Sequence, residues 1–111
     1  MPATPYDSAM FRDLFLDRET AALFTDSAEI RAMLLVLGAL ARAQGELGVI
    51  PETAAAAIHR AAAEVLIDPG ALCAETGRSA VVVPALVKAF RAEMKAPDHA
   101  RYVHWGATSQ D

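Results

Sequence analysis

The sequence predicts an all-α fold of four or five helices, and three observations support that class. Apolar residues recur at spacings of three and four over long stretches, which places them on one face of a helix. Clusters of proline, glycine and aspartate separate these stretches, as they do at turns between helices. The run most like a strand, the valines at residues 81–83, has no second run to pair with and precedes Pro84. With 111 residues, we expect a single helical domain.

The first part of the chain predicts an arm followed by a short helix. Residues 1–8 carry two prolines and no apolar period, so we expect them to form an extended arm. Asp7 or Ser8 is a suitable N-cap for a short helix through residues 11–15, because its side-chain oxygen accepts a hydrogen bond from a free backbone N–H.

A long helix is predicted to begin at an N-cap formed by Asp26 or Ser27. Its apolar stripe consists of residues spaced by three or four, namely Ile30, Met33, Leu34, Leu37, Leu40 and Ala41. Gly45 and Gly48 weaken the end of this helix, and Pro51 cannot continue it. Pro51 is instead placed to begin a second, alanine-rich helix.

The second helix is expected to end near Val65, and an Asp-Pro-Gly turn follows at residues 68–70. A short helix over residues 71–76 should end at Gly77, after which Ser79 can cap the next helix.

That last long helix has Pro84 in its first turn, and Pro97 and Asp98 close it. Its apolar face is formed by residues at helical spacing, namely Leu86, Val87, Phe90 and Met94.

Composition excludes some functions and leaves one question open. The chain is 54% hydrophobic and 22% charged, so either alanine inflates the apolar fraction or a partner subunit or further chain covers some of this surface. The net charge of −4, without a basic cluster, gives no support for nucleic-acid binding. The longest apolar run is about half of what a bilayer span requires. The single cysteine, Cys73, lies among apolar neighbours and is expected to be a buried structural thiol in a reducing cytoplasm.

Residues 104–111 differ in kind from the rest, because they bring together an imidazole, two hydroxyls, an amide and a carboxylate. Thr108 or Ser109 is a suitable N-cap for a new helix, and Thr108 with Asp111 approximates a capping box. Free N–H groups at a helix N-terminus form a site for an anion, which hydroxyl groups can also bind. His104 is a candidate for proton transfer or for contact with an anion. The plainer alternatives are a cap without a ligand and a structural histidine.

The other potential ligands are sparse. His59 and His99 are expected to face solvent, and no pair of histidines has the spacing of a metal site. Gly106, within the motif, is expected to let the backbone approach a ligand closely.

The sequence of residues 104–111, His-Trp-Gly-Ala-Thr-Ser-Gln-Asp, resembles the first conserved block of the fumarase/aspartase superfamily. The form Gly-Ala-Thr-Ser-Gln-Asp, preceded by Tyr-Val, is similar to the 3-carboxy-cis,cis-muconate cycloisomerase family within it. Residues 39–51 resemble the first long helix of that family and its exit, and residues 81–87 resemble a second stretch of it. The similarity covers most of residues 7–111, and the terminal block is its most specific part.

The resemblance implies a helical N-terminal domain that leads into a central bundle of long helices, which this sequence does not include. It also implies a cytoplasmic homotetramer whose active sites combine residues of different subunits, with no metal or organic cofactor. The implied reaction closes 3-carboxy-cis,cis-muconate to 4-carboxymuconolactone in protocatechuate breakdown. The position of His104 is linked in relatives to binding or proton relay, those of Thr108 and Ser109 contact substrate carboxylates, and Gln110 is a possible pocket position.

The sequence also departs from the superfamily. The mobile Ser-Ser-x-Met-Pro-x-Lys-x-Asn loop, which supplies the proposed catalytic base in relatives, is absent, so we expect the chain alone to be inactive. Adenylosuccinate lyases usually carry a His-Asp pair where either Arg78-Ser79 or Ser79-Ala80 stands here, and the missing histidine disfavours that family. Two alternatives remain: a sister lyase acting on adenylosuccinate or argininosuccinate, and a helical assembly module without catalysis.

Overall fold

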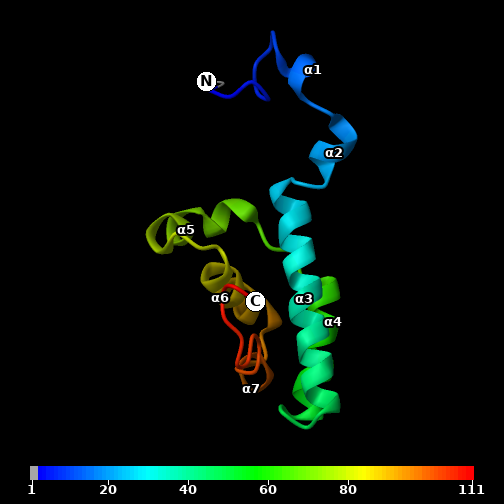
Figure 1. Ribbon diagram of the computed structural model, residues 1–111. Helices are drawn as coiled ribbons and strands as arrows, with labels where there is room; N and C mark the ends of the chain where they lie inside the picture. Colours follow the sequence, from blue (N-terminus) through cyan, green and yellow to red (C-terminus); the bar gives the residue numbers. More distant parts are fainter. Residues whose placement is uncertain (1–2) are drawn as a thin grey trace.

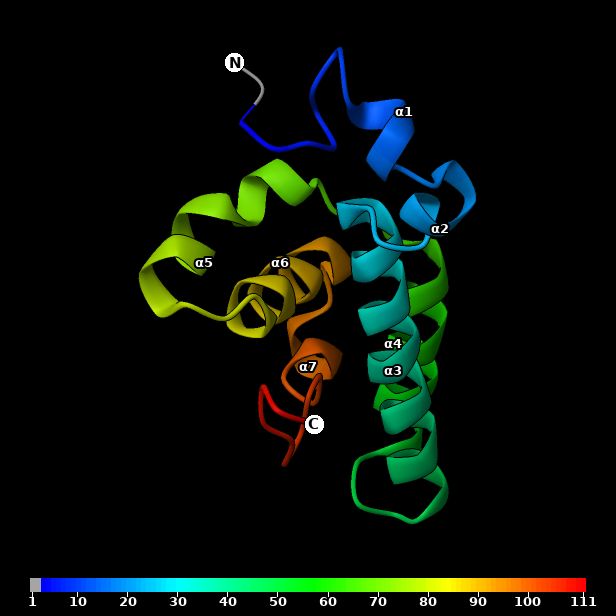
Figure 2. The same cartoon turned by 45° about the horizontal axis from the view of Figure 1, so that its top comes forward.

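The computed structural model describes residues 3–111, which form seven α-helices and one 3-10 helix and contain no strand. Three helices form the body: α3 (Asp26–Glu46), α4 (Glu52–Glu64) and α6 (Val83–Met94). α3 and α4 run side by side in opposite directions, and α6 lies beside this pair (Figures 1 and 2). The predicted all-α class is therefore confirmed.

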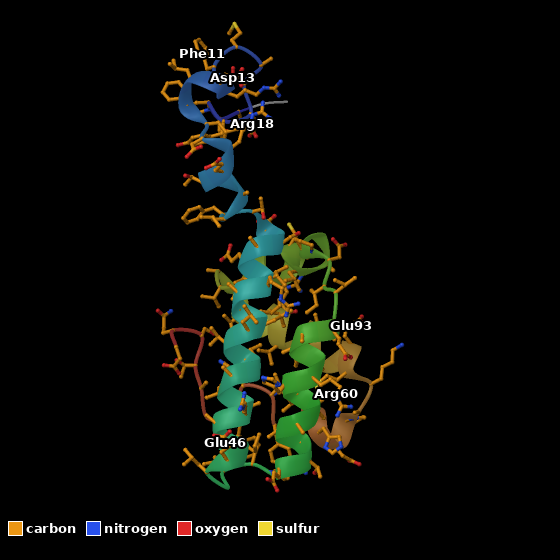
Figure 3. All side chains as sticks on the ribbon, turned by 90° about the vertical axis from the view of Figure 1, so that its right-hand side faces the viewer. Phe11, Asp13, Arg18, Glu46, Arg60 and Glu93 are labelled. Atoms are coloured by element: carbon orange, nitrogen blue, oxygen red, sulfur yellow. The ribbon has the colours of Figure 1, made fainter. Side chains whose placement is uncertain are left out.

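Five shorter helices complete the chain. They are α1 (Arg12–Phe15), α2 (Arg18–Ala22), η1 (Pro69–Leu72), α5 (Cys73–Ser79) and α7 (Pro97–Ala100). α1 and α2 extend beyond the N-terminal end of α3, which makes the molecule elongated, with dimensions of 55 × 28 × 23 Å (Figure 1). An exposed ion pair between Arg18 and Asp13, 3.7 Å apart, lies in this extension, at the opposite end of the molecule from Glu46 (Figure 3).

The core lies between α3, α4 and α6. Its largest fully buried side chains are Phe90, Leu34, Ile58, Leu86 and Val103. Most of the predicted apolar residues of α3 and α6 are buried, whereas Met33, Leu40 and Met94 are half-buried at the edge. Val103 lies in the segment that follows α7, and its side chain is buried in this core. This burial anchors the start of the chemically distinct motif at residues 104–111.

Two glycines of α3 allow the close approach of α4. A Cβ atom on Gly38 would lie 2.9 Å from the Ala62 Cβ, and one on Gly45 would lie 2.4 Å from the Ala55 Cβ. Both distances are below ordinary carbon–carbon contact, about 3.5–4.0 Å. The sequence indicated only that Gly45 weakens the end of the helix. In the fold, its missing side chain also lets α3 contact Ala55 of α4.

Several predicted helix ends need correction. The N-cap of α3 is Thr25 rather than Asp26 or Ser27, because Thr25 is the last residue with extended backbone and its hydroxyl accepts from the Ala28 N–H at 3.1 Å. α5 continues through Gly77 to Ser79, because glycine inside a helix lowers its stability by only about 1 kcal/mol and does not prevent it from forming. Ser79 does not cap α6; its hydroxyl lies 2.8 Å from the Val81 carbonyl and 3.0 Å from the Glu75 carbonyl, and its single proton is donated to one of them at a time.

The N-terminal arm also differs from the prediction. Residues 1 and 2 lie outside the described residues, and the rest of the arm forms overlapping turns rather than extended backbone. The Asp7 N–H donates to the Thr4 carbonyl at 3.1 Å, and the Ser8 N–H donates to the Pro5 carbonyl at 3.4 Å. The predicted cap at Asp7 or Ser8 is wrong for α1, whose N-cap is Phe11 without a side-chain hydrogen bond. The Ser8 hydroxyl instead accepts from the Phe11 N–H at 3.2 Å, in the turn that precedes the helix.

The short helices α2 and α7 were not expected, because helices of four or five residues leave little periodic signal in a sequence. Cys73 is exposed, which corrects the expectation of a buried thiol: the buried neighbour is Leu72, and the start of α5 turns the next side chain outward. His59 is exposed as predicted, but His99 is half-buried on α7. Within the described residues, no helix is both long and apolar enough to cross a bilayer.

Candidate functional site

The motif at residues 104–111 borders a cleft of about 700 Å³. One wall of the cleft is apolar and is formed by residues of α3 and α6, namely Ala32, Met33, Val36, Leu37, Leu40, Val83 and Leu86. The opposite wall is the motif itself, and Gln44 lies at the end of the α3 wall. Figure 3 shows the motif, in red, beside α3 on the side away from α4. All four candidate residues, His104, Thr108, Ser109 and Gln110, line this cleft.

The start of the motif is held against the body of the fold. The Val103 side chain is fully buried, and the Trp105 ring packs against Tyr102 with 5.0 Å between ring centroids. Between these anchors, His104 has a left-handed backbone with φ of 61°, a conformation that is uncommon for residues other than glycine. This backbone conformation sets the direction in which the imidazole leaves the chain.

The His104 ring is half-buried and contacts the backbone of its own motif. Its Nε2 atom lies 3.1 Å from the Thr108 carbonyl oxygen. Because a carbonyl oxygen only accepts, Nε2 carries the proton in this contact, and in a neutral ring Nδ1 is then the acceptor. A ring fixed in one tautomer with a free second nitrogen is suited to accepting a proton or a hydrogen bond.

The predicted helix at Thr108 is present only as a single turn within the described residues. The Asp111 N–H donates to the Thr108 carbonyl at 3.2 Å, and the Gln110 N–H donates to the Thr108 hydroxyl at 3.3 Å. The Asp111 carboxylate accepts from the Thr108 N–H at 2.7 Å, which is the half of a capping box that the sequence predicted.

This turn limits the expected anion site. As the capping-box spacing predicted, the Thr108 amide binds the Asp111 carboxylate, and the Thr108 hydroxyl lies 3.3 Å from the same oxygen. Among the side-chain hydrogen bonds within residues 3–111, none involves the half-buried Ser109 hydroxyl, so this group is available to a ligand.

Gly106 has a backbone conformation that favours glycine. Its φ of 72° lies in the left-handed region, where a side chain is strained, whereas a Cβ atom there would meet no protein atom within 4 Å. The close approach of this backbone to a ligand stays a prediction.

The cleft carries little charge of its own. Within residues 3–111, the lining of the cleft includes the imidazole of His104 and the carboxylate of Asp111 but neither Lys nor Arg. Within residues 3–111 no group of three His, Cys, Asp or Glu side chains could hold a metal ion. A polyanionic ligand would therefore need cationic partners from outside this cleft.

Sequence reasoning missed two residues that bind backbone carbonyls next to His104. Gln44 Nε2 donates to the Trp105 carbonyl at 2.7 Å, and an Arg91 guanidinium nitrogen donates to the Val103 carbonyl at 2.8 Å. Gln44 could have been found, because it lies on the extension of the apolar stripe, four residues after Leu40. Arg91 carries no such signal, since it lies on the largely exposed side of α6.

Comparisons with known proteins agree with this arrangement. The sequence is 43% identical over 108 residues to 3-carboxy-cis,cis-muconate cycloisomerase of Acinetobacter baylyi, a match that covers 94% of this chain and 24% of the relative. The crystal structure of the cycloisomerase from Acinetobacter calcoaceticus sp. ADP1 superimposes with a TM-score of 0.84 at 42% identity, covering 91% of this chain and 24% of that one. This chain has the helical fold of the fumarase/aspartase superfamily.

Sister enzymes are similar as well. N-acetyl-S-(2-succino)cysteine lyase of Enterococcus italicus is 39% identical over 95% of this chain and 23% of its own length. The chain thus spans about a quarter of the length of the relatives it matches. No protein-family model matches the sequence. The resemblance that residues 104–111 indicated is confirmed by these similarities.

Proposed function

We propose that this chain supplies the first active-site segment of a 3-carboxy-cis,cis-muconate cycloisomerase, which closes its substrate to 4-carboxymuconolactone in protocatechuate breakdown. The observation that carries the proposal is the 43% identity to such an enzyme over 94% of the chain. The motif that resembles the family's conserved block lines a cleft large enough for a small tricarboxylate.

We propose roles for the cleft residues that the resemblance implies and that their geometry supports. Ser109 binds a substrate carboxylate, because its hydroxyl is free to donate. Thr108 binds a second carboxylate after its hydroxyl and amide exchange Asp111 for the substrate. His104 binds or relays a proton through Nδ1 while Nε2 stays bound to the Thr108 carbonyl. Gln110 is exposed at the rim and contributes to the pocket there.

The reaction itself joins a substrate carboxylate oxygen to an alkene carbon, and a proton adds to the neighbouring carbon. An alkene next to carboxylates reacts in this way when its developing negative charge is stabilised by nearby donors. The groups that donate the proton and most of the positive charge belong to other segments of the parent enzyme, because the cleft has neither Lys nor Arg. In this proposal the parent enzyme is a cytoplasmic homotetramer that uses no metal or organic cofactor.

The test is to read the source gene beyond codon 111, express its full product, and assay it with 3-carboxy-cis,cis-muconate. We expect turnover of this substrate and loss of about 10²–10⁴-fold in kcat for His104→Gln, the range for removing a proton-transfer group. Ser109→Ala should chiefly raise KM. Turnover of N-acetyl-S-(2-succino)cysteine or adenylosuccinate without turnover of carboxymuconate would move the chain to a sister lyase, an alternative that the 39% identity to one such lyase supports.

A further inference from the structure

The backbone on both sides of His104 is held by side chains from two different helices. Arg91, on α6, donates to the Val103 carbonyl at 2.8 Å. Gln44, on α3, donates to the Trp105 carbonyl at 2.7 Å. The Val103 carbonyl belongs to the peptide that precedes His104, so Arg91 holds that flanking peptide plane directly. The Trp105 carbonyl belongs to the peptide between Trp105 and Gly106, so Gln44 holds the chain one peptide beyond the plane that follows His104.

His104, between these two carbonyls, is one of the residues other than glycine that have a left-handed backbone. His104 has a φ of 61°, and an L-residue in this region places its Cβ too close to a carbonyl oxygen. Such a conformation persists only where surrounding contacts hold it, and it is common at functional sites. Arg91 makes a charge-assisted hydrogen bond, which is the stronger kind.

The orientation of the Gln44 amide is set by its hydrogen bond to the Trp105 carbonyl. Its Oε1 atom is buried and has no hydrogen-bond partner within the described residues, while its Nε2 atom binds the Trp105 carbonyl. An unpaired buried acceptor is unfavourable. The opposite orientation of the amide would face its oxygen toward the carbonyl oxygen, so the bond to Trp105 decides which way the side chain points.

We propose that Gln44 and Arg91 are positioning residues that hold His104 in its left-handed conformation and so aim its imidazole into the cleft. The effect on activity rests on the proposed function, whereas the effect on the backbone does not. Gln44 borders the cleft and could also touch a ligand. Arg91 is not among the lining residues, so its substitution isolates the positioning effect.

The experiment uses the full-length protein that carries this chain, with Arg91→Met and Gln44→Met as variants. Both substitutions remove the hydrogen-bond donor, the Gln44 amide or the Arg91 guanidinium. Both keep an unbranched side chain that can pack in the same place. Lys88→Met is the matched control, because Lys88 is an exposed cation on the same helix α6. Hydrogen–deuterium exchange without substrate should accelerate at least about tenfold in residues 103–108 for both variants. Exchange within α4 should stay unchanged, as should all exchange in Lys88→Met.

A double-mutant cycle then tests whether Arg91 acts through His104. Arg91→Met should lower kcat/KM by at least about tenfold in the wild-type background and by less than about twofold in a His104→Gln background. Equal losses in both backgrounds, unchanged exchange in residues 103–108, or acceleration spread evenly over all helices would each overturn the proposal. If the wild-type protein does not turn over carboxymuconate, the proposed function fails while the exchange measurement still decides the positioning role.

Discussion

The contact between Gly45 and Ala55 makes a sharp test of how α3 and α4 pack. In Gly45→Ala, the new Cβ atom would lie 2.4 Å from the Ala55 Cβ. That is more than about 1 Å inside ordinary carbon–carbon contact. The neighbouring atom is attached directly to the α4 backbone, so it cannot rotate away, and the two helices must separate locally.

The expected change in stability is the sum of two opposing effects. Replacing glycine by alanine inside a helix stabilises it by roughly 1 kcal/mol. Overpacking a well-filled contact costs roughly 1–3 kcal/mol, and the depth of this overlap favours the upper part of that range. We therefore expect Gly45→Ala to lower the free energy of unfolding by about 1–2 kcal/mol.

Urea unfolding followed by the helical circular dichroism signal measures this change. Gly77→Ala is the matched control, because Gly77 lies inside α5 and a Cβ atom there meets nothing within 4 Å. It should stabilise the chain by about 0.5–1 kcal/mol. Combining Gly45→Ala with Ala55→Gly moves the methyl group across the contact and should restore near-wild-type stability. If Gly45→Ala stabilises as much as Gly77→Ala, or if the double variant shows no recovery, the packing argument is refuted.

Three further outcomes are expected. Thr25→Ala should lower the free energy of unfolding by about 1 kcal/mol in urea, since it removes the N-cap of α3, whereas Thr25→Ser should retain it; equal losses in both variants would contradict a capping role. Lys95→Gly should stabilise the chain by about 1 kcal/mol in the same assay, because Lys95 ends α6 with a φ of 51°; a loss would show that its side chain contributes more than its backbone conformation costs. The chain of residues 1–111 should bind a hydrophobic dye and self-associate in sedimentation, because it exposes large apolar side chains such as Phe24, 78% exposed, and Leu14, 74% exposed; a monomer without dye binding would contradict this.

The long helices were predictable because their signals are local. Periodic apolar residues in α3 and α6, and the alanine run in α4, define helices whatever lies nearby. Their ends were less predictable. Thr25, Asp26 and Ser27 are all suitable caps, and only the point at which the backbone leaves the extended region distinguishes them.

The candidate site was predictable as a set of residues but not as an arrangement. The unusual chemistry of residues 104–111 identified it, and the structure brings all of its candidates to one cleft. The spacing of Thr108 and Asp111 predicted the bond between the Asp111 carboxylate and the Thr108 amide. It did not predict that the Gln110 N–H, rather than the Asp111 N–H, donates to the Thr108 hydroxyl, because that depends on the conformation of the turn.

By itself, the sequence determined the helices, the apolar faces and the resemblance to the superfamily, because each depends on residues close together along the chain. Only the tertiary structure decided that Gly45 touches Ala55, that Cys73 faces outward, and that Gln44 and Arg91 bind the carbonyls beside His104. Gln44 and Trp105 are 61 positions apart, and their contact follows from how α3 lies against the segment after α7. Local propensities set where each helix forms, whereas the packing of the assembled helices sets which side chains meet.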